Sequence, residues 1–214
     1  CLTANSSVDI MEEQVRKFKP DMVCMMSEAA AKELKGKISD TDTKVVCGMD
    51  GLIECATYDK ADTVLNSVVG MVGLQPTLEA IKAKKTLALA NKETLVAGGH
   101  LVTNLAKENG VQILPVDSEH SAIFQSMQGM PNKKAVKKII LTASGGPFFG
   151  KTLAELENVT AKDALKHPNW NMGAKITIDS ATMMNKGLEF IEAKWLFDMP
   201  NEDIEIVVHR ESVV

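Results

Sequence analysis

The sequence lacks three features, each of which would point to a particular class of partner or site. Acidic residues outnumber basic ones, 28 against 24, so the chain has no excess of the positive charge that binds nucleic-acid phosphates. Its 4 cysteines form no C-x-x-C pair, which argues against a zinc ribbon or a thioredoxin-type site. No apolar run approaches the roughly 18 residues that a membrane span requires, and no signal peptide is recognisable. We therefore expect neither a nucleic-acid partner nor a membrane partner.

The cysteines indicate a reducing compartment. Cys24 and Cys47 lie inside apolar runs, so we expect both to be small buried side chains. Reduced thiols and the missing leader favour a cytoplasmic location. The chain begins without Met and ends on the strand-like run HRESVV, so we expect it to be a piece of a longer protein.

Short apolar runs alternate with longer segments of helical period over the first half of the chain. Strands are expected at 21–26, 43–48, 62–70, 86–90 and 111–116. Helices are expected at 27–38, 49–56, 74–85 and 92–110. This alternation predicts an α/β fold with a parallel sheet and helices on both faces. Ligands bind such sheets beyond the carboxyl ends of the strands.

After residue 118 the pattern becomes mixed, and we expect a second domain of α+β type over 118–214, following a first domain over 1–117. A helix is expected at 120–130, a strand at 136–144, a brief strand running into a long helix at 174–197, and a closing strand at 204–209. Residues 144–174 show little periodicity beyond a helical portion at 152–156. A loop of this length is usually functional or mobile, so a hinged lid carrying Trp170 is expected, the alternative being a plain surface loop.

The run ILPVDSEHSAIFQ, residues 113–125, places two carboxylates where a buried strand ends. Asp117 and Glu119 are two positions apart, and in an extended chain such side chains point the same way. Two adjacent carboxylates repel each other unless a cation lies between them, and Mg²⁺ or Mn²⁺ suits such oxygen ligands. The alternative is that Asp117 or Ser118 caps the next helix, with Glu119 in its first turn.

The run DSATMMNKGLEF, residues 179–190, contains a second group of polar side chains. On a helix, Asn185 and Lys186 lie four and three positions before Glu189 and share a face with it. Ser180, Asn185 and Lys186 would suit a phosphate group, and Glu189 could be a third metal ligand. The alternative is a capped helix with an ordinary Lys–Glu pair.

Three weaker signals remain. The NKE triplet at 91–93 places Lys92 where a sheet strand ends, so it could anchor a substrate oxygen. GMVGLQPT at 70–77 is similar to a phosphate-binding glycine turn, but the full G-x-G-x-x-G is absent. His167 lies in the expected lid and could donate to a phosphate or hydroxyl group. The other three histidines, at positions 100, 120 and 209, are interpreted as structural.

Taken together, several stretches resemble the 1-deoxy-D-xylulose 5-phosphate reductoisomerase family. They are GLQPTLEAI, LANKETLVAGG, LPVDSEHSAIFQ, LTASGGPF and HPNWNMGAKITIDSATMMNKGLEFIEAKWLF, together with the terminal ES-VV. The resemblance implies a Rossmann-like NADPH-binding domain, incomplete at its N-terminus, followed by a catalytic domain with a flexible lid. It also implies a homodimer, and we expect the contact region to lie near IEIVVHRES at 204–212.

The resemblance further implies a role for each matching position. The implied ligands of Mg²⁺ or Mn²⁺ are Asp117, Glu119 and Glu189. The implied phosphate contacts are Ser144, Ser180, Asn185 and Lys186, with His167 reaching in from the lid. Trp170 is implied to close over the substrate. The implied contacts to the hydroxyl and carbonyl end of the substrate are Lys92 and Ser118. The implied NADPH contacts are Asn91, Glu93 and Gly173, with Asn5 and Ser6 fitting more loosely. Lys92, His167 and the three carboxylates are expected to act in catalysis.

The implied reaction converts 1-deoxy-D-xylulose 5-phosphate to 2-C-methyl-D-erythritol 4-phosphate by rearrangement and reduction, a step of non-mevalonate isoprenoid synthesis. The family's first strand with its glycine-rich turn and its C-terminal helical domain have no counterpart in the sequence, so we expect the 214-residue chain alone to be nearly inactive. Two alternatives remain open. One is an ordinary NAD(P)-dependent sugar-phosphate dehydrogenase without metal, and the other is a metal- and phosphate-binding module without catalysis.

Overall fold

The computed structural model describes residues 1–132, 135–168 and 170–211, and the chain divides into two compact units. The first unit holds residues 1–94 and 104–114, and the second holds residues 95–103 and 115–214. The domain boundary expected at residue 117 stays a prediction. Among the described residues, no helix is long and apolar enough to cross a lipid bilayer.

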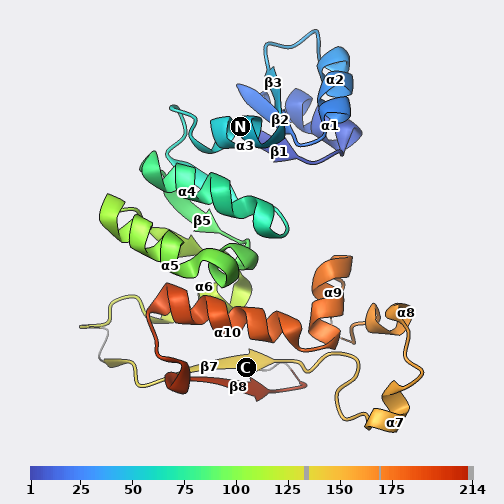
Figure 1. The fold of residues 1–214 in the computed structure, drawn as a ribbon, viewed down its shortest axis with the longest axis vertical. Helices are drawn as coiled ribbons and strands as arrows, with labels where there is room; N and C mark the ends of the chain where they lie inside the picture. Colours follow the sequence, from blue (N-terminus) through green and yellow to red (C-terminus); the bar gives the residue numbers. More distant parts are fainter. Residues whose placement is uncertain (133–134, 169, 212–214) are drawn as a thin grey trace. The chain divides into compact units, whose positions relative to one another are not determined.

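The first unit begins with three parallel strands and the helices that connect them (Figure 1). The strands lie in the order β1 (Leu2–Ala4), β2 (Met22–Met25) and β3 (Lys44–Cys47). The helices are α1 (Val8–Phe18), α2 (Glu28–Lys37) and α3 (Gly48–Ala56). The prediction of a parallel α/β arrangement is confirmed, although α1 was not among the expected helices.

Strand β2 is buried along its whole length, and its alternate side chains face different helices. Val23 and Met25 belong to the apolar cluster that contains residues of α1 and α2. Met22 and Cys24 pack instead with Leu52 of α3. Because successive side chains of a strand point to opposite faces, α1 and α2 cover one face of the sheet and α3 covers the other.

The prediction that Cys47 is buried is wrong. Cys24 is buried in the central strand, and burial raises the pKa of its thiol to about 11. Cys47 is exposed, because it ends β3, which lies at the edge of its sheet. A position inside an apolar run therefore predicts burial more reliably when the strand is central than when the strand lies at the edge of the sheet.

A second set of three strands completes the first unit. Its strands lie in the order β4 (Thr63–Asn66), β5 (Thr86–Leu89) and β6 (Ile113–Pro115). After β4 come the short 3-10 helix η1 (Met71–Gly73) and helix α4 (Leu74–Lys82), and after β5 comes α5 (Lys92–Asn109). Asn91 caps α5 by accepting a hydrogen bond from the backbone N–H of Thr94 at 2.8 Å. The strands β4 and β5 pair in parallel, as the alternation predicts.

The second unit is built on two parallel strands that α10 (Met184–Phe197) covers (Figure 1). The strands are β7 (Ile139–Ala143) and β8 (Ile204–Val208). Leu141, Ala193 and Ile204 are buried at the centre of this packing. Helix α6 (Ser118–Ser126) contributes Ile123 and Phe124 to the same cluster. This core holds α10, and with it Glu189, in a fixed position relative to the second unit's strands.

The strand expected at the start of 174–197 is absent, and that prediction is wrong. Residues Ala174–Ala181 form helix α9 instead. Thr177 donates from Oγ1 to the carbonyl of Gly173 at 2.8 Å, and Lys175 pairs with Asp179 one turn later at 2.8 Å. Strand propensity of β-branched residues is a weak preference that such local helical contacts override.

Two short helices lie in the segment that was expected to be a lid. They are α7 (Leu153–Leu156), inside the helical portion expected at 152–156, and α8 (Ala161–Ala164), which was not expected. Each begins with a capping box, formed by Thr152 with Glu155 and by Thr160 with Asp163. The T-x-x-E and T-x-x-D patterns are the sequence signal for both helix starts.

Candidate metal and phosphate site

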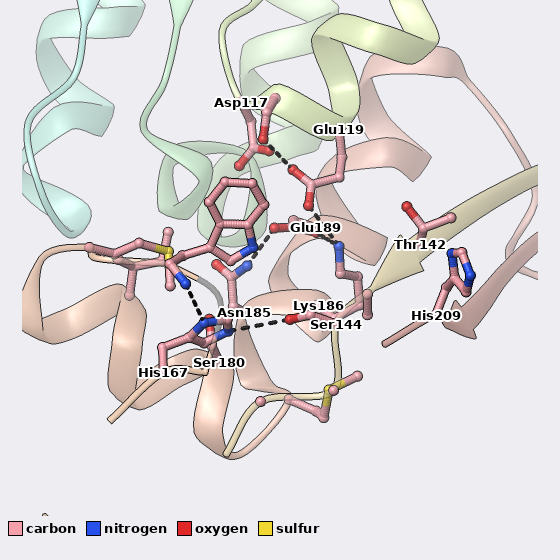
Figure 2. Close-up of a pocket in the computed structure, with 18 of the residues that line it drawn as sticks. Asp117, Glu119, Thr142, Ser144, His167, Ser180, Asn185, Lys186, Glu189 and His209 are labelled. Atoms are coloured by element: carbon pink, nitrogen blue, oxygen red, sulfur yellow. Dashed lines mark hydrogen bonds and ion pairs between the residues drawn. The ribbon is translucent and has the colours of Figure 1, made fainter. Parts of the chain in front are cut away.

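The second unit contains a cavity of about 710 Å³. Its walls come from α6, the end of β7, the 144–174 segment, α9 and α10, and most of the labelled polar side chains in Figure 2 point into it. The cavity therefore gathers residues that are up to 92 positions apart in the chain, from Asp117 to His209.

Three carboxylates converge at one end of this cavity. Asp117, Glu119 and Glu189 each offer an oxygen, and these oxygens lie within 4.8 Å of one another. Glu189 is almost completely buried, with a side chain only 1% exposed, whereas the side chain of Glu119 is 32% exposed. Buried carboxylates are costly unless they are paired or coordinate a cation. Three oxygen ligands of this type suit Mg²⁺ or Mn²⁺, so the residues fit the ion that the sequence predicts.

The route by which Asp117 and Glu119 come together differs from the expectation of an extended chain. Asp117 occupies the N-cap position of α6 but makes no capping hydrogen bond, and Glu119 lies in the first helical turn. The backbone carbonyl of Asp117 accepts from the N–H of Ser121, so the helix start is held without the Asp117 side chain. The carboxylate of Asp117 therefore belongs to the carboxylate cluster and does not cap the helix, contrary to the alternative of simple capping.

Neighbouring donors hold the carboxylates in place. Ser118 donates from Oγ to Glu119 at 2.6 Å, and Asn185 donates from Nδ2 to Glu189 Oε1 at 2.5 Å. The Lys186 ammonium lies 3.0 Å from Glu119 Oε1 and 2.5 Å from Glu189 Oε2. Lys186 thus joins carboxylates of α6 and α10, and its own side chain is only 6% exposed.

The residues predicted to contact phosphate line the same cavity. Ser144, at the end of β7, and His167, in the 144–174 segment, are joined by a hydrogen bond of 3.3 Å between Oγ and Nε2 (Figure 2). Ser180, Asn185 and Lys186 line the cavity from α9 and α10. The structure brings this set together in the cavity that also contains the carboxylates, and its role in phosphate binding stays a prediction.

His167 is held in its neutral form. Its Nδ1 accepts from the backbone N–H of Trp170 at 3.0 Å, so the ring proton must lie on Nε2, which faces Ser144. Partial burial lowers the pKa of His167, because it disfavours the charged form. A neutral ring can donate one hydrogen bond to an anion without a proton being supplied first. Trp170 is 58% exposed and lines the cavity.

Gly146 permits the close approach of two segments at the cavity. Its φ is +68°, and a Cβ at this position would lie 2.5 Å from the backbone carbonyl oxygen of Ser180. A distance below 3.0 Å is not tolerated without movement of the backbone. The lack of a side chain at Gly146 therefore allows the turn after β7 to lie against the backbone of Ser180.

His120 and Glu192 were missed by sequence reasoning, which interpreted His120 as merely structural. Both side chains are fully buried, and His120 Nδ1 lies 3.5 Å from Asp117 Oδ1 and 3.5 Å from Glu192 Oε2. His120 Nε2 donates to the backbone carbonyl of Glu189 at 2.9 Å, so one imidazole links both metal-ligand segments. Burial by itself would lower the pKa of His120, but Asp117 and Glu192 outweigh it and the pKa is raised.

A spacing signal for these two residues is present in the sequence. His120 follows Asp117 by three positions and Glu192 follows Glu189 by three, so each lies on the same helix face as a predicted ligand. His209 was also missed, and it lines the cavity beside Thr142 from the end of β8 (Figure 2). Its position at the end of the expected closing strand, 204–209, is the available signal.

The remaining predicted residues are Lys92, Asn91, Glu93, Asn5 and Ser6 in the first unit, and Gly173 in the second. Asn91 is 2% exposed, and its Nδ2 donates to the carbonyls of Val68 and Gly70. It therefore ties the start of α5 to the loop after β4. Lys92 is buried in the first turn of α5, and Gly173 is the N-cap residue of α9. The roles predicted for all six residues stay predictions.

Parallel strands with helices on both faces, followed by a cluster of carboxylates beside hydrogen-bond donors, place the chain in the class of α/β proteins that carry a candidate divalent-metal site. Comparison with known families narrows this class. Residues 1–99 match the model described as 1-deoxy-D-xylulose 5-phosphate reductoisomerase, and residues 113–197 match the model of that family's C-terminal domain. The chain belongs to the 1-deoxy-D-xylulose 5-phosphate reductoisomerase family.

Individual relatives agree with this assignment. The chain is 59% identical over 213 residues to the 1-deoxy-D-xylulose 5-phosphate reductoisomerase of Agathobacter rectalis, covering 100% of this chain and 56% of that protein. It is 56% identical to 1-deoxy-D-xylulose 5-phosphate reductoisomerase 1 of Bacillus thuringiensis subsp. konkukian, covering 100% of this chain and 55% of that protein. The chain therefore spans about half the length of the curated relatives it matches.

Solved structures of the family have the same fold. A crystal structure of DOX-P reductoisomerase in complex with NADPH, fosmidomycin and magnesium matches with a TM-score of 0.93 and 45% identity, over 99% of this chain and 54% of that one. The enzyme from Zymomonas mobilis in complex with NADPH matches with a TM-score of 0.90 and 43% identity, over the same shares.

Proposed function

We propose that the protein to which this chain belongs is an NADPH-dependent reductoisomerase that converts 1-deoxy-D-xylulose 5-phosphate to 2-C-methyl-D-erythritol 4-phosphate with a divalent metal ion. The observation that carries the proposal is the convergence of Asp117, Glu119 and Glu189, whose oxygens lie within 4.8 Å of one another. A dehydrogenase that only moves a hydride does not require three such carboxylates at one point. Relatives that match over the whole chain bear the reductoisomerase name, and a structural relative was crystallised with NADPH and magnesium.

Some side chains of the cavity would bind the substrate's phosphate group, and others would hold the metal ion that activates the substrate. Ser144, Ser180 and Asn185 offer neutral donors to the phosphate group, while Lys186 offers one positive charge. Anchoring the phosphate far from the reacting carbons fixes the orientation of the sugar. His167 would add a further donor, and Trp170 would keep water away from the reacting centre.

The carboxylates would hold a divalent ion, with Ser118 fixing the orientation of Glu119. A bound Mg²⁺ or Mn²⁺ supplies Lewis-acid polarisation of a substrate ketone, and NADPH supplies the hydride. Lys92, Ser118 and the NADPH contacts Asn91, Glu93, Gly173, Asn5 and Ser6 are part of this proposal on the strength of their positions in the family motifs.

The decisive assay follows NADPH oxidation with 1-deoxy-D-xylulose 5-phosphate, using the chain extended to the length of its relatives. We expect turnover that EDTA abolishes and that Mn²⁺ restores. Turnover that survives EDTA would favour the ordinary sugar-phosphate dehydrogenase. Tight metal and phosphate binding without turnover would favour the non-catalytic module.

We also propose a homodimer and a cytoplasmic location. The two-stranded sheet of the second unit exposes Ile140 and Val207 on the same face, each more than 40% accessible, which supports an apolar contact there with a second copy. Ser212, at the end of the expected contact region, lies outside the described residues. The cytoplasmic proposal rests on the four free cysteines. Light scattering on the extended chain, with Val207→Glu as the disrupting variant, tests the dimer.

A further inference from the structure

Both oxygens of the Glu189 carboxylate are engaged by residues of the proposed phosphate set. Asn185 Nδ2 donates to Oε1 at 2.5 Å, and Lys186 Nζ lies 2.5 Å from Oε2 (Figure 2). The same ammonium lies 3.0 Å from Glu119 Oε1. Two of the four predicted phosphate donors are therefore directed at predicted metal ligands.

Lys186 is placed to neutralise the carboxylate cluster. It is the sole lysine or arginine among the described residues that line the cavity. Its side chain is 6% exposed and that of Glu189 is 1% exposed, so water screens their attraction poorly. Three carboxylates within 4.8 Å of one another repel, and the ammonium relieves that repulsion.

A divalent ion and this ammonium compete for the same oxygens. An ion bound by Glu119 and Glu189 would neutralise the two carboxylates that attract the Lys186 ammonium. Its own positive charge would also repel the ammonium. Lys186 has a flexible four-carbon stem and three donors, so it can turn away from the carboxylates. Asn185, on the preceding position of α10, is released from Glu189 at the same time.

We propose that Lys186 is an internal counter-cation that a divalent metal ion displaces, and that this exchange frees Lys186 and Asn185 to bind the substrate's phosphate group. The proposal rests on the proposed function and adds a coupling between metal binding and phosphate binding. In the absence of the metal, the phosphate subsite is partly blocked by its own acidic neighbours. Metal binding assembles the phosphate subsite, and by reciprocity a bound phosphate tightens metal binding.

The test is a titration with Mn²⁺ alone in phosphate-free buffer, followed by the electron paramagnetic resonance signal of the free ion. It uses the chain extended to the length of its relatives. Lys186→Met removes the competing charge and keeps the apolar stem, so we expect it to bind Mn²⁺ roughly ten-fold more tightly than the unmodified protein, a coupling of usual size. Lys138→Met is the matched control, because Lys138 pairs with Glu205 on the surface, outside the cavity lining. The control should bind Mn²⁺ unchanged.

Lys186→Arg gives a second, independent outcome, which decides the matter if the methionine variant does not fold. A guanidinium always carries its charge and binds carboxylates through two parallel hydrogen bonds. It should compete better than lysine, so we expect Mn²⁺ binding several-fold weaker than in the unmodified protein. An unchanged or weaker affinity in Lys186→Met overturns the proposal, as does an unchanged or tighter affinity in Lys186→Arg. If the unmodified protein binds no Mn²⁺, the proposed function itself fails.

Discussion

Single residues in the second unit take part in more than one interaction of the site. Glu189 is a candidate metal ligand through its carboxylate, and its backbone carbonyl receives a hydrogen bond from His120. His120 in turn contacts Asp117 and Glu192. The candidate metal ligands are therefore supported by a buried histidine and a buried carboxylate. Residues that hydrogen-bond to the direct metal ligands orient those ligands. Substituting such residues usually lowers the affinity for the metal.

Glu192→Gln should reveal the charge on His120. The pKa of His120 is raised in the folded protein, so its contribution to stability is fully present below the unfolded value of 6.5 and is lost as pH rises through the folded value. We expect the metal-free variant to lose about 1–2 kcal/mol of stability near pH 6, with the loss narrowing at alkaline pH. Thermal unfolding of both proteins across pH measures this. A difference that widens as pH rises would contradict a charged His120.

His167 should report on phosphate binding. Without ligand, its pKa should lie below the usual 6.5, because partial burial disfavours the charged ring. A phosphate dianion nearby favours the charged form and should raise that pKa. Nuclear magnetic resonance of the histidine rings, with and without inorganic phosphate, follows both values, and His100 in the same unit serves as an internal control. A His167 pKa that phosphate leaves unchanged would remove His167 from the phosphate set.

At the scale of elements, helix starts and tight turns place the site. The carboxylates Asp117 and Glu119 are presented by the start of α6, and the donors Asn185 and Lys186 by the first turn of α10. The turn after β7 contributes Gly145 and Gly146, both with φ above +60°. The left-handed region favours glycine, so these turns constrain the sequence as strongly as the polar residues do.

Gly146→Ala should damage the phosphate side of the cavity. A Cβ there meets the Ser180 carbonyl oxygen at 2.5 Å, so α9 must move. We expect the KM for the sugar phosphate to rise roughly ten-fold with a smaller change in kcat, because misplacing a positioning group weakens binding. Gly150→Ala is the control, since Gly150 has a similar φ of +80° but nothing within 4 Å of its added Cβ. Equal effects of the two changes would mean that backbone strain alone is responsible.

Comparison of the helices and strands with the expected ones shows which features the sequence could predict and which it could not. Asp117, Glu119 and Glu189 were named from their motifs, and the structure brings them together. The reason given for the first two was wrong, because they converge at a helix start and not along an extended strand. The start of helix α9 was predicted as a brief strand, since β-branched residues obscured a helix that local contacts stabilise. Burial of His120 and Glu192 depends on tertiary packing, which no local pattern encodes.

At the scale of the whole molecule, the chain spans about half the length of its relatives, so activity is expected of the extended protein. We expect the 214-residue chain to oxidise NADPH with 1-deoxy-D-xylulose 5-phosphate at less than about 1% of the extended chain's rate, because turnover depends on every group that orients substrate and cofactor. Matched assays of both chains measure this. Comparable turnover by the shorter chain would contradict the expectation.

Cysteine labelling tests the first unit independently of any ligand. Burial raises the pKa of Cys24 to about 11 and that of Cys55 to about 12. Both thiols should therefore react far more slowly at pH 8 than the exposed Cys1 and Cys47. Mass spectrometry after brief alkylation identifies the modified positions. Rapid labelling of Cys24 would show that the packing of β2 against α3 is incorrect.

The most direct test is an anomalous difference map at the manganese absorption edge, from crystals of the extended protein soaked with Mn²⁺. We predict one peak in the second unit, about 2.1–2.3 Å from an oxygen of each of Asp117, Glu119 and Glu189. A peak held by the first two residues alone, with Glu189 still bound to Lys186, would contradict that arrangement, and so would the lack of any peak there.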